Sequence, residues 1–186
     1  MNNNIYKYIQ NSMINNKICR FNKSDINIFV TQIYAPLPDF LKKEYYYIIE
    51  KAVSIWNKYS SVRFNITENQ YSADIVILWT KAGIKFEGMC KFKSIVASEF
   101  KSITIEIGLP NEKSPKHIDA NTILHTTLHE LGHSLGLGHG VSEDDIMFVP
   151  HKKTLCCPSK NDIDVLNILY SYPCGTDFKI ICNDLK

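Results

Sequence analysis

The sequence predicts an α+β fold in which a twisted sheet is covered by a long helix and by a second helix that carries several histidines. Between residues 25 and 107, short segments alternate apolar and polar residues with the period of a half-buried strand. One longer segment repeats apolar residues at three- and four-residue steps, the period of an amphipathic helix. At 186 residues, with 45% hydrophobic and 22% charged residues, the chain has the composition of one ordinary globular domain.

The first half of the chain is expected to form a strand followed by the long helix. Isoleucine and valine alternate along Asp25–Ile33, and the prolines that follow end this strand. Asp39 comes directly before the helical pattern, where its carboxylate is expected to cap the first turn. The core-facing stripe of the helix consists of Leu41, Tyr45, Ile48, Ile49, Ala52, Val53, Trp56 and Tyr59.

Three further strands are expected after the long helix. Val62–Ile66 alternates, Asp74–Thr80 is almost continuously apolar and suits a central strand, and Ser102–Ile107 alternates again. Gly83–Glu99 shows no clear period and is predicted to be a loop.

Capping residues indicate two more helices. Asp119 or Asn121 is expected to cap a helix through the histidine-rich segment. Ser159, with Asp162 three residues later, is a variant of the capping box, and the helix that follows is expected to end before Pro173.

The histidine-rich helix contains the pattern HExxHxxGxxH. Its residues are His129, Glu130, His133, Gly136 and His139. On a helix the first two histidines are one turn apart, so their side chains project from one face, about 6 Å apart along the axis. Two imidazole nitrogens at this spacing can bind one zinc ion, and the glutamate can accept a proton from a metal-activated water without being a ligand itself.

The third histidine requires the helix to end. A continued helix would carry His139 more than half a turn around the axis from His133. Gly136 is therefore expected at the turn that ends the helix, because glycine tolerates a positive φ. Three neutral histidines leave a fourth ligand position open, which is typical of a catalytic rather than a structural zinc site. The alternatives are ordinary polar residues on a helix surface and a zinc domain without catalysis; the match at five fixed positions and the retained Glu130 argue against them.

The motif and its surroundings resemble the metzincin clan of zinc endopeptidases and, within it, the matrixins, the matrix-metalloprotease family. Met147 lies eight residues after His139, the matrixin spacing of the Met-turn, and HELGHSLGLGH closely resembles the matrixin active-site helix. The segments AVSIWNKYSSVRFNI, SADIVILW and NDIDVLNILYSYP resemble the family's long helix with its next strand, its central strand and its closing helix. Two departures are Gly140, where matrixins usually have serine, and Val149, which stands before Pro150.

The resemblance spans about residues 23–173 and implies the architecture. The sheet is expected to be mainly parallel with one antiparallel edge strand, which is assigned to Ser102–Ile107. The catalytic domain would divide into an upper subdomain, residues 23–139, and a small lower subdomain, residues 140–173, with the Met-turn and one helix. The remaining segments, 1–22 and 174–186, are predicted to be tails; the first is rich in Asn and Lys with little periodicity.

The resemblance also implies how the site works. The three histidines would bind zinc, Glu130 would be the general base, and Met147 would form an apolar floor beneath the metal. The backbone of the expected edge strand would pair with an extended substrate, and the segment after the Met-turn would line the S1′ pocket. The expected substrate-binding residues are Ile103, Thr104, Ile105, His125, Phe148, Val149 and Pro150.

His125 lies one turn before His129, and three hypotheses stay open for it. It could be a partly exposed histidine satisfied by water or by a carbonyl group. It could be a fourth zinc ligand, although it lies about 12 Å along the axis from His133. By the resemblance, it could limit the depth of the S1′ pocket, where burial would keep the imidazole neutral and make the pocket shorter and more polar than a leucine would.

One catalytic Zn²⁺ is the only cofactor predicted. The chain has no histidine between Trp79 and Lys116, so the structural zinc of matrixins is not expected, and calcium is unsupported. A protein or peptide substrate is the expected partner. The net charge of +2 gives no argument for nucleic acid, and no apolar run is long enough to span a membrane. The protein is expected to be a monomer.

Six cysteines favour two or three disulfides in an oxidising compartment over buried free thiols. They and the resemblance favour a secreted or extracellular protein, whereas the N-terminus, MNNNIYKYIQNSMINN, shows no apolar signal-peptide core, so the compartment stays open. Cys19 invites comparison with the cysteine by which matrixin propeptides cap their zinc, but KICRFNK lacks the family's Pro, Gly and Asp, which favours a disulfide or a free thiol. The alternative functions are a non-catalytic zinc-containing peptide-binding module and a narrow-specificity intracellular processing or toxin protease.

Overall fold

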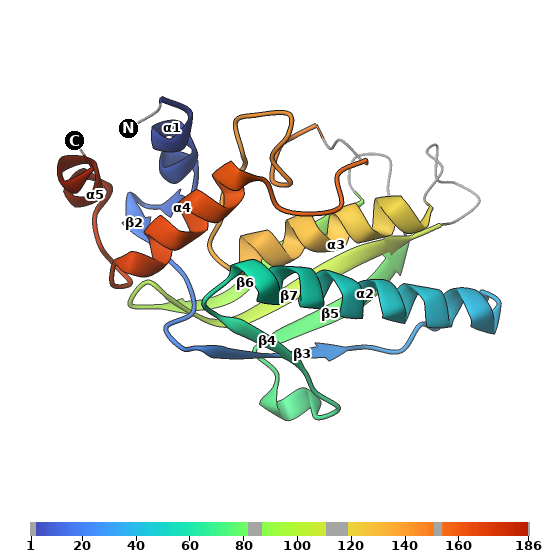
Figure 1. Ribbon diagram of the computed structural model, residues 1–186. Helices are drawn as coiled ribbons and strands as arrows, with labels where there is room; N and C mark the ends of the chain where they lie inside the picture. Colours follow the sequence, from blue (N-terminus) through green and yellow to red (C-terminus); the bar gives the residue numbers. More distant parts are fainter. Residues whose placement is uncertain (1–2, 82–86, 111–118, 151–153, 186) are drawn as a thin grey trace.

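A five-stranded sheet lies along one side of the molecule, with the helices over one of its faces (Figure 1). The computed structural model describes residues 3–81, 87–110, 119–150 and 154–185. The strands follow the order β4-β3-β5-β7-β6; the first four run parallel and β6 is antiparallel to β7. This confirms the predicted mainly parallel sheet with an antiparallel edge strand. The strands are β3 (Asp25–Val30), β4 (Arg63–Ile66), β5 (Ile75–Lys81), β6 (Gly88–Val96) and β7 (Glu99–Leu109).

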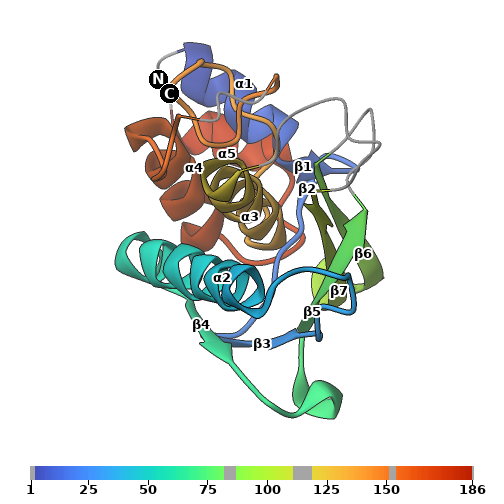
Figure 2. The same cartoon turned by 90° about the vertical axis from the view of Figure 1, so that its right-hand side faces the viewer.

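Two helices, α2 (Asp39–Tyr59) and α3 (Ala120–Ser134), pack side by side on one face of the sheet (Figure 2). Trp56 of α2 is fully buried, and its indole Nε1 donates a hydrogen bond to the carbonyl of Leu128 in α3, at 2.9 Å. Burying each isoleucine of the sheet beneath the helices contributes roughly 1.5–3 kcal/mol. The fully buried isoleucines of β3, β5 and β7 are Ile26, Ile28, Ile75, Ile77, Ile103, Ile105 and Ile107.

Capping was predicted correctly at two helices and wrongly at a third. Asp119 accepts a hydrogen bond from the Thr122 backbone at the start of α3. Ser159 and Asp162 form the predicted capping box of α4 (Lys160–Ser171). Pro38, rather than Asp39, is the N-cap residue of α2, and no side chain caps this helix. Asp39 is the first residue of α2, where its negative charge interacts favourably with the positive end of the helix dipole.

The segment predicted to be a loop, residues 83–99, contains the edge strand β6; residues 83–86 of that prediction lie outside the described part. The reason for the error is that Gly88–Val96 is half-exposed along its length and shows no clean alternation. The β6–β7 turn also contains no glycine. Its two positive φ angles, 50° and 64°, are adopted by Ala97 and Ser98. The pattern therefore carried neither a strand signal nor a hairpin signal.

The predicted tails are wrong as well. Residues 3–18 form helix α1 (Asn3–Asn11) and a short hairpin of β1 (Met13–Ile14) and β2 (Lys17–Ile18). Helix α5 (Phe178–Asp184) ends the chain, and α1, α4 and α5 gather beyond one end of α3 (Figure 1). Tyr8, Ile9 and Ile181 have no exposed surface. Nine residues rich in Asn give only a weak helical pattern in the sequence. Helix α1 is stable here because tertiary packing covers its apolar face.

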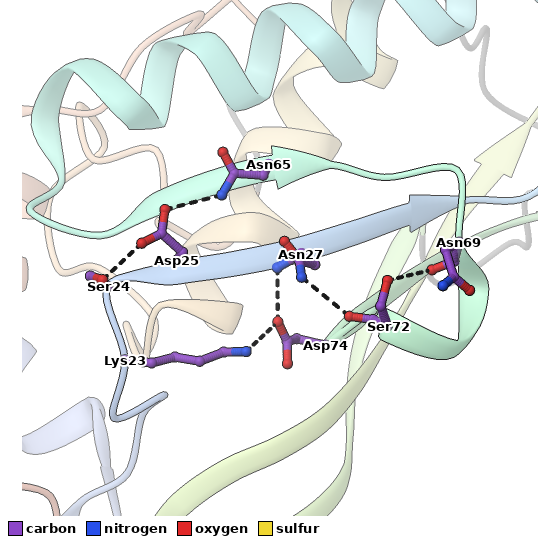
Figure 3. Close-up of polar contacts among 8 residues, drawn as sticks. All are labelled: Lys23, Ser24, Asp25, Asn27, Asn65, Asn69, Ser72 and Asp74. Atoms are coloured by element: carbon purple, nitrogen blue, oxygen red, sulfur yellow. Dashed lines mark hydrogen bonds and ion pairs between the residues drawn. The ribbon is translucent and has the colours of Figure 1, made fainter.

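A polar network fixes the register where the parallel strands begin (Figure 3). The Asp25 carboxylate accepts a hydrogen bond from the Asn65 side chain at 3.2 Å, which joins β3 to β4. The Asp74 carboxylate accepts one from the backbone N–H of Asn27 at 2.8 Å and lies 2.6 Å from the Lys23 ammonium group. Each of these polar groups has a partner among its neighbours, so their role here is to hold the strands together.

The disulfide framework favoured by the cysteine count is not formed: all six cysteines are free thiols. They are Cys19, Cys90, Cys156, Cys157, Cys174 and Cys182. Among the helices of the described residues, none has the length and apolar character needed to cross a membrane.

Candidate metal centre

Helix α3 places the first two histidines of the motif next to each other. It is buried along most of its length, and His129 is 2% exposed. The ring centroids of His129 and His133 are 4.7 Å apart with the rings nearly perpendicular, as expected for side chains one helical turn apart.

The chain reverses at Gly136 and brings in the third histidine. Gly136 has a φ of +96°, and its N–H donates to the carbonyl of His133 at 2.9 Å, which ends the helix. The ring of His139 then lies 5.6 Å from that of His129 and 5.1 Å from that of His133. One ring nitrogen of each histidine lies within 4.8 Å of the others, so the three can hold one metal ion.

Backbone carbonyls set the tautomers of the two helical histidines. Nδ1 of His129 lies 3.0 Å from the carbonyl oxygen of Ile146, and Nδ1 of His133 lies 2.8 Å from that of Leu137. A carbonyl only accepts, so each Nδ1 carries the proton and each Nε2 keeps a lone pair for a metal. Burial lowers the pKa of His139, which also favours the neutral imidazole that a metal needs. The residues therefore fit a zinc ion.

Glu130 is a buried carboxyl group beside these histidines, 4% exposed. Burial raises its pKa to about 8, and a hydrogen bond from the backbone N–H of Cys90 opposes the shift. Strand β6 passes directly over it: a Cβ on Gly88 would lie 3.0 Å from Glu130 Oε1 and would overlap the Thr126 methyl group. Sequence reasoning missed Gly88 and Cys90, although a glycine inside a strand is the usual sign of such a close approach.

Met147 is fully buried beneath α3. A Cβ on Gly132, between the two helical histidines, would overlap Met147 Sδ, so the thioether fills the space under this turn of the helix. The N–H of Gly140 donates to the Met147 carbonyl at 2.8 Å, which closes the loop between the third histidine and the methionine.

Two buried aspartates organise the loop around Met147, and sequence reasoning missed both roles. Asp145 is fully buried and accepts hydrogen bonds from the backbone of Val141 and Ser142. Asp162 accepts from the N–H of Ile146 at 2.8 Å, and Ile146 is the residue whose carbonyl binds His129.

The edge-strand position expected for Ile103, Thr104 and Ile105 is wrong, and the substrate-binding role expected for them depended on it. These residues lie in β7, which pairs with β5 on one side and with β6 on the other. A strand paired on both sides has no free backbone groups to offer a substrate, whereas an edge strand does. Strand β6 holds that position.

His125 is buried, 1% exposed, which rules out the partly exposed alternative. Its Nδ1 lies 3.2 Å from the carbonyl oxygen of Leu155, and its ring is stacked toward that of His129 with centroids 6.4 Å apart. The metal-ligand group found among the described residues does not include it. After the Met-turn, Phe148 is half-buried, and Val149 and Pro150 are exposed.

The fold and the histidine group together define a zinc metallopeptidase domain. Residues 20–171 match the family described as matrixin, peptidase family M10. The chain belongs to the matrixin family, whose members are zinc-dependent metalloendopeptidases.

Proposed function

We propose that the protein is an endopeptidase that hydrolyses extended polypeptides at the centre formed by His129, His133 and His139. The observation that carries this proposal is Glu130, a buried carboxyl group next to three histidines that each offer one ring nitrogen within 4.8 Å of the others. A site that only stabilises the fold has no need of a buried, desolvated base at this position.

The three histidines would hold the zinc ion through neutral imidazoles. A zinc ion bound there supplies Lewis-acid activation of a water molecule and of the scissile carbonyl group. Glu130 accepts the proton of the attacking water at its carboxylate and then delivers it to the nitrogen of the leaving amine. The backbone N–H of Cys90 stabilises the charged carboxylate before it accepts the proton and again after it has delivered it.

Strand β6 is our candidate for substrate binding, in place of residues 103–105. It is the edge strand of the sheet, and Gly88 and Cys90 place it against Glu130. An extended peptide can add to such an edge through main-chain hydrogen bonds, which gives affinity with little dependence on sequence. The scissile bond of a peptide paired with β6 would lie next to the general base.

We further propose that His125, Phe148, Val149 and Pro150 line the S1′ pocket. His125 supports this proposal because it is buried, stacks toward a zinc ligand and bonds to Leu155 in the segment after the Met-turn. Burial disfavours a charged ring, so His125 would add a neutral, polar surface to the pocket. We expect a preference for small or polar residues after the scissile bond.

Cleavage-site profiling of the wild type and of His125→Leu tests the pocket. The leucine variant should accept larger apolar residues at P1′, because it replaces a polar ring by an apolar side chain. The same P1′ preference in both enzymes would show that His125 does not line the pocket.

A peptide library incubated with the purified protein tests the activity itself. Cleavage should occur within extended peptides, stop when a zinc chelator is added and return with excess zinc. Peptide binding without cleavage by the zinc-loaded protein would instead support a non-catalytic binding module.

A further inference from the structure

The N-terminal segment that was expected to be a tail contacts the loop that carries the third histidine. Gly138, directly before His139, donates its N–H to the Ser12 hydroxyl at 2.9 Å, and the Asn11 side chain donates to the His139 carbonyl at 2.9 Å. The two backbones are so close that a Cβ on Gly138 would overlap the carbonyl oxygen of Asn11. The turn at Gly136 is also covered, since a Cβ there would lie 2.9 Å from the carbonyl oxygen of Cys19.

A second chain of contacts leads from the same helix to His129. The Tyr8 hydroxyl donates to Asp162 Oδ1 at 2.6 Å, in a buried contact between residues far apart in the sequence. The other oxygen of Asp162 accepts from the N–H of Ile146 at 2.8 Å, and the Ile146 carbonyl accepts from His129 Nδ1 at 3.0 Å. Tyr8 is therefore connected to a metal-ligating histidine by three consecutive hydrogen-bonding steps.

Ser12 links the two series of hydrogen bonds, the one at Gly138 and the one that begins at Tyr8. Its hydroxyl accepts from Gly138 and donates to the carbonyl of Tyr8 at 2.9 Å, and its residue is 4% exposed. Buried hydrogen bonds of this kind keep the groups in one geometry. Breaking one of these bonds would leave a buried polar group with neither a water nor a protein partner. Partners that orient the ligands of a metal typically contribute 10–100-fold to metal affinity or activity, about the range expected here.

We propose that Tyr8 and Ser12 are positioning residues of the metal centre: Tyr8 orients His129 through Asp162 and Ile146, and Ser12 fixes the loop that ends at His139. This inference rests on the proposed zinc site. It makes residues 3–12 a part of the metal centre and not a segment that can be removed without effect on it.

The test compares Tyr8→Phe and Ser12→Ala with two matched variants of the full chain. Tyr6→Phe removes a hydroxyl from the same helix on a residue that packs against Phe178 instead, with ring centroids 5.1 Å apart. Ser171→Ala removes a hydroxyl that, like that of Ser12, bonds to a helix carbonyl, at 2.8 Å. Zinc dissociation constants are measured by chelator competition, and the visible spectrum of the cobalt-substituted proteins reports the ligand geometry.

Tyr8→Phe and Ser12→Ala should weaken zinc binding about tenfold and change the cobalt spectrum, whereas the matched variants should equal the wild type. Thermal unfolding of the metal-free proteins shows whether each variant folds. A purely structural role would lower the unfolding temperature and leave the cobalt spectrum unchanged. Unchanged zinc affinity and spectra in both variants would overturn this inference alone. A wild type that binds no zinc would overturn the proposed function, and this inference with it.

Discussion

Single residues decide what the metal centre can do. The carbonyls of Ile146 and Leu137 orient His129 and His133, so a metal finds two imidazoles already in the required tautomer. His139 differs, because it lies beyond the end of the helix and its position depends on the turn at Gly136. The motif could be predicted from sequence since its spacing reflects local helix geometry. The carbonyl partners of these histidines could not be predicted from the sequence, because the fold decides which carbonyls lie next to the imidazole rings.

His139→Ala should reduce zinc affinity strongly while the protein stays folded. The change leaves two protein ligands, and the side chain lies at the surface, where truncation does little to the core. Metal analysis after dialysis against a weak chelator measures the effect. Stoichiometric zinc in this variant would show that His139 is not a ligand.

Among the elements around the site, strand β6 lies against Glu130 and was the hardest to predict. It has neither the alternation that identified β3 nor the apolar run that identified β5, and its turn uses no glycine. The strands and helices that were predicted correctly each have a strong local pattern or a cap. The assignment of the edge position to β7 failed because pairing partners are a property of the whole sheet.

Gly88→Ala should lower kcat without loss of zinc. The added methyl group would overlap Thr126 and press on Glu130, so either β6 or the Glu130 side chain has to move. A displacement of about 1 Å at a reacting group can reduce the rate 100-fold. Peptide hydrolysis and zinc content are measured together, with the exposed Lys93→Ala of the same strand as the control. Wild-type kcat in Gly88→Ala would contradict the close approach of β6 to the base.

At the scale of the whole molecule, the first and last described helices, α1 and α5, lie beside α4 (Figure 1). Arg20 is 7% exposed; its guanidinium donates to the carbonyls of Leu169 and Tyr172 at the end of α4 and lies over the Tyr170 ring, 4.3 Å from the centroid. A cation at a helix C-terminus satisfies the last carbonyls and the helix dipole together. This role was not predicted, since nothing in the sequence around Arg20 indicates a partner about 150 residues later.

Arg20→Ala should lower the free energy of unfolding by about 3 kcal/mol, because it leaves buried carbonyls without a donor and removes the packing on Tyr170. Denaturant titration of the metal-free protein measures this change, and the exposed Arg63→Ala is the control. An equal, small effect of both substitutions would show that Arg20 does not hold the N-terminal segment to α4.

The central claim, that this molecule is a metallopeptidase with Glu130 as its general base, is tested most directly by Glu130→Ala. The three histidines remain, so the variant should bind one equivalent of zinc, while its peptide hydrolysis should fall by about 10²–10⁴-fold. Zinc content and turnover are measured on the same sample, with the exposed Glu68→Ala as the control. Full zinc with more than roughly a tenth of the wild-type turnover, well above the expected loss, would contradict the role of Glu130.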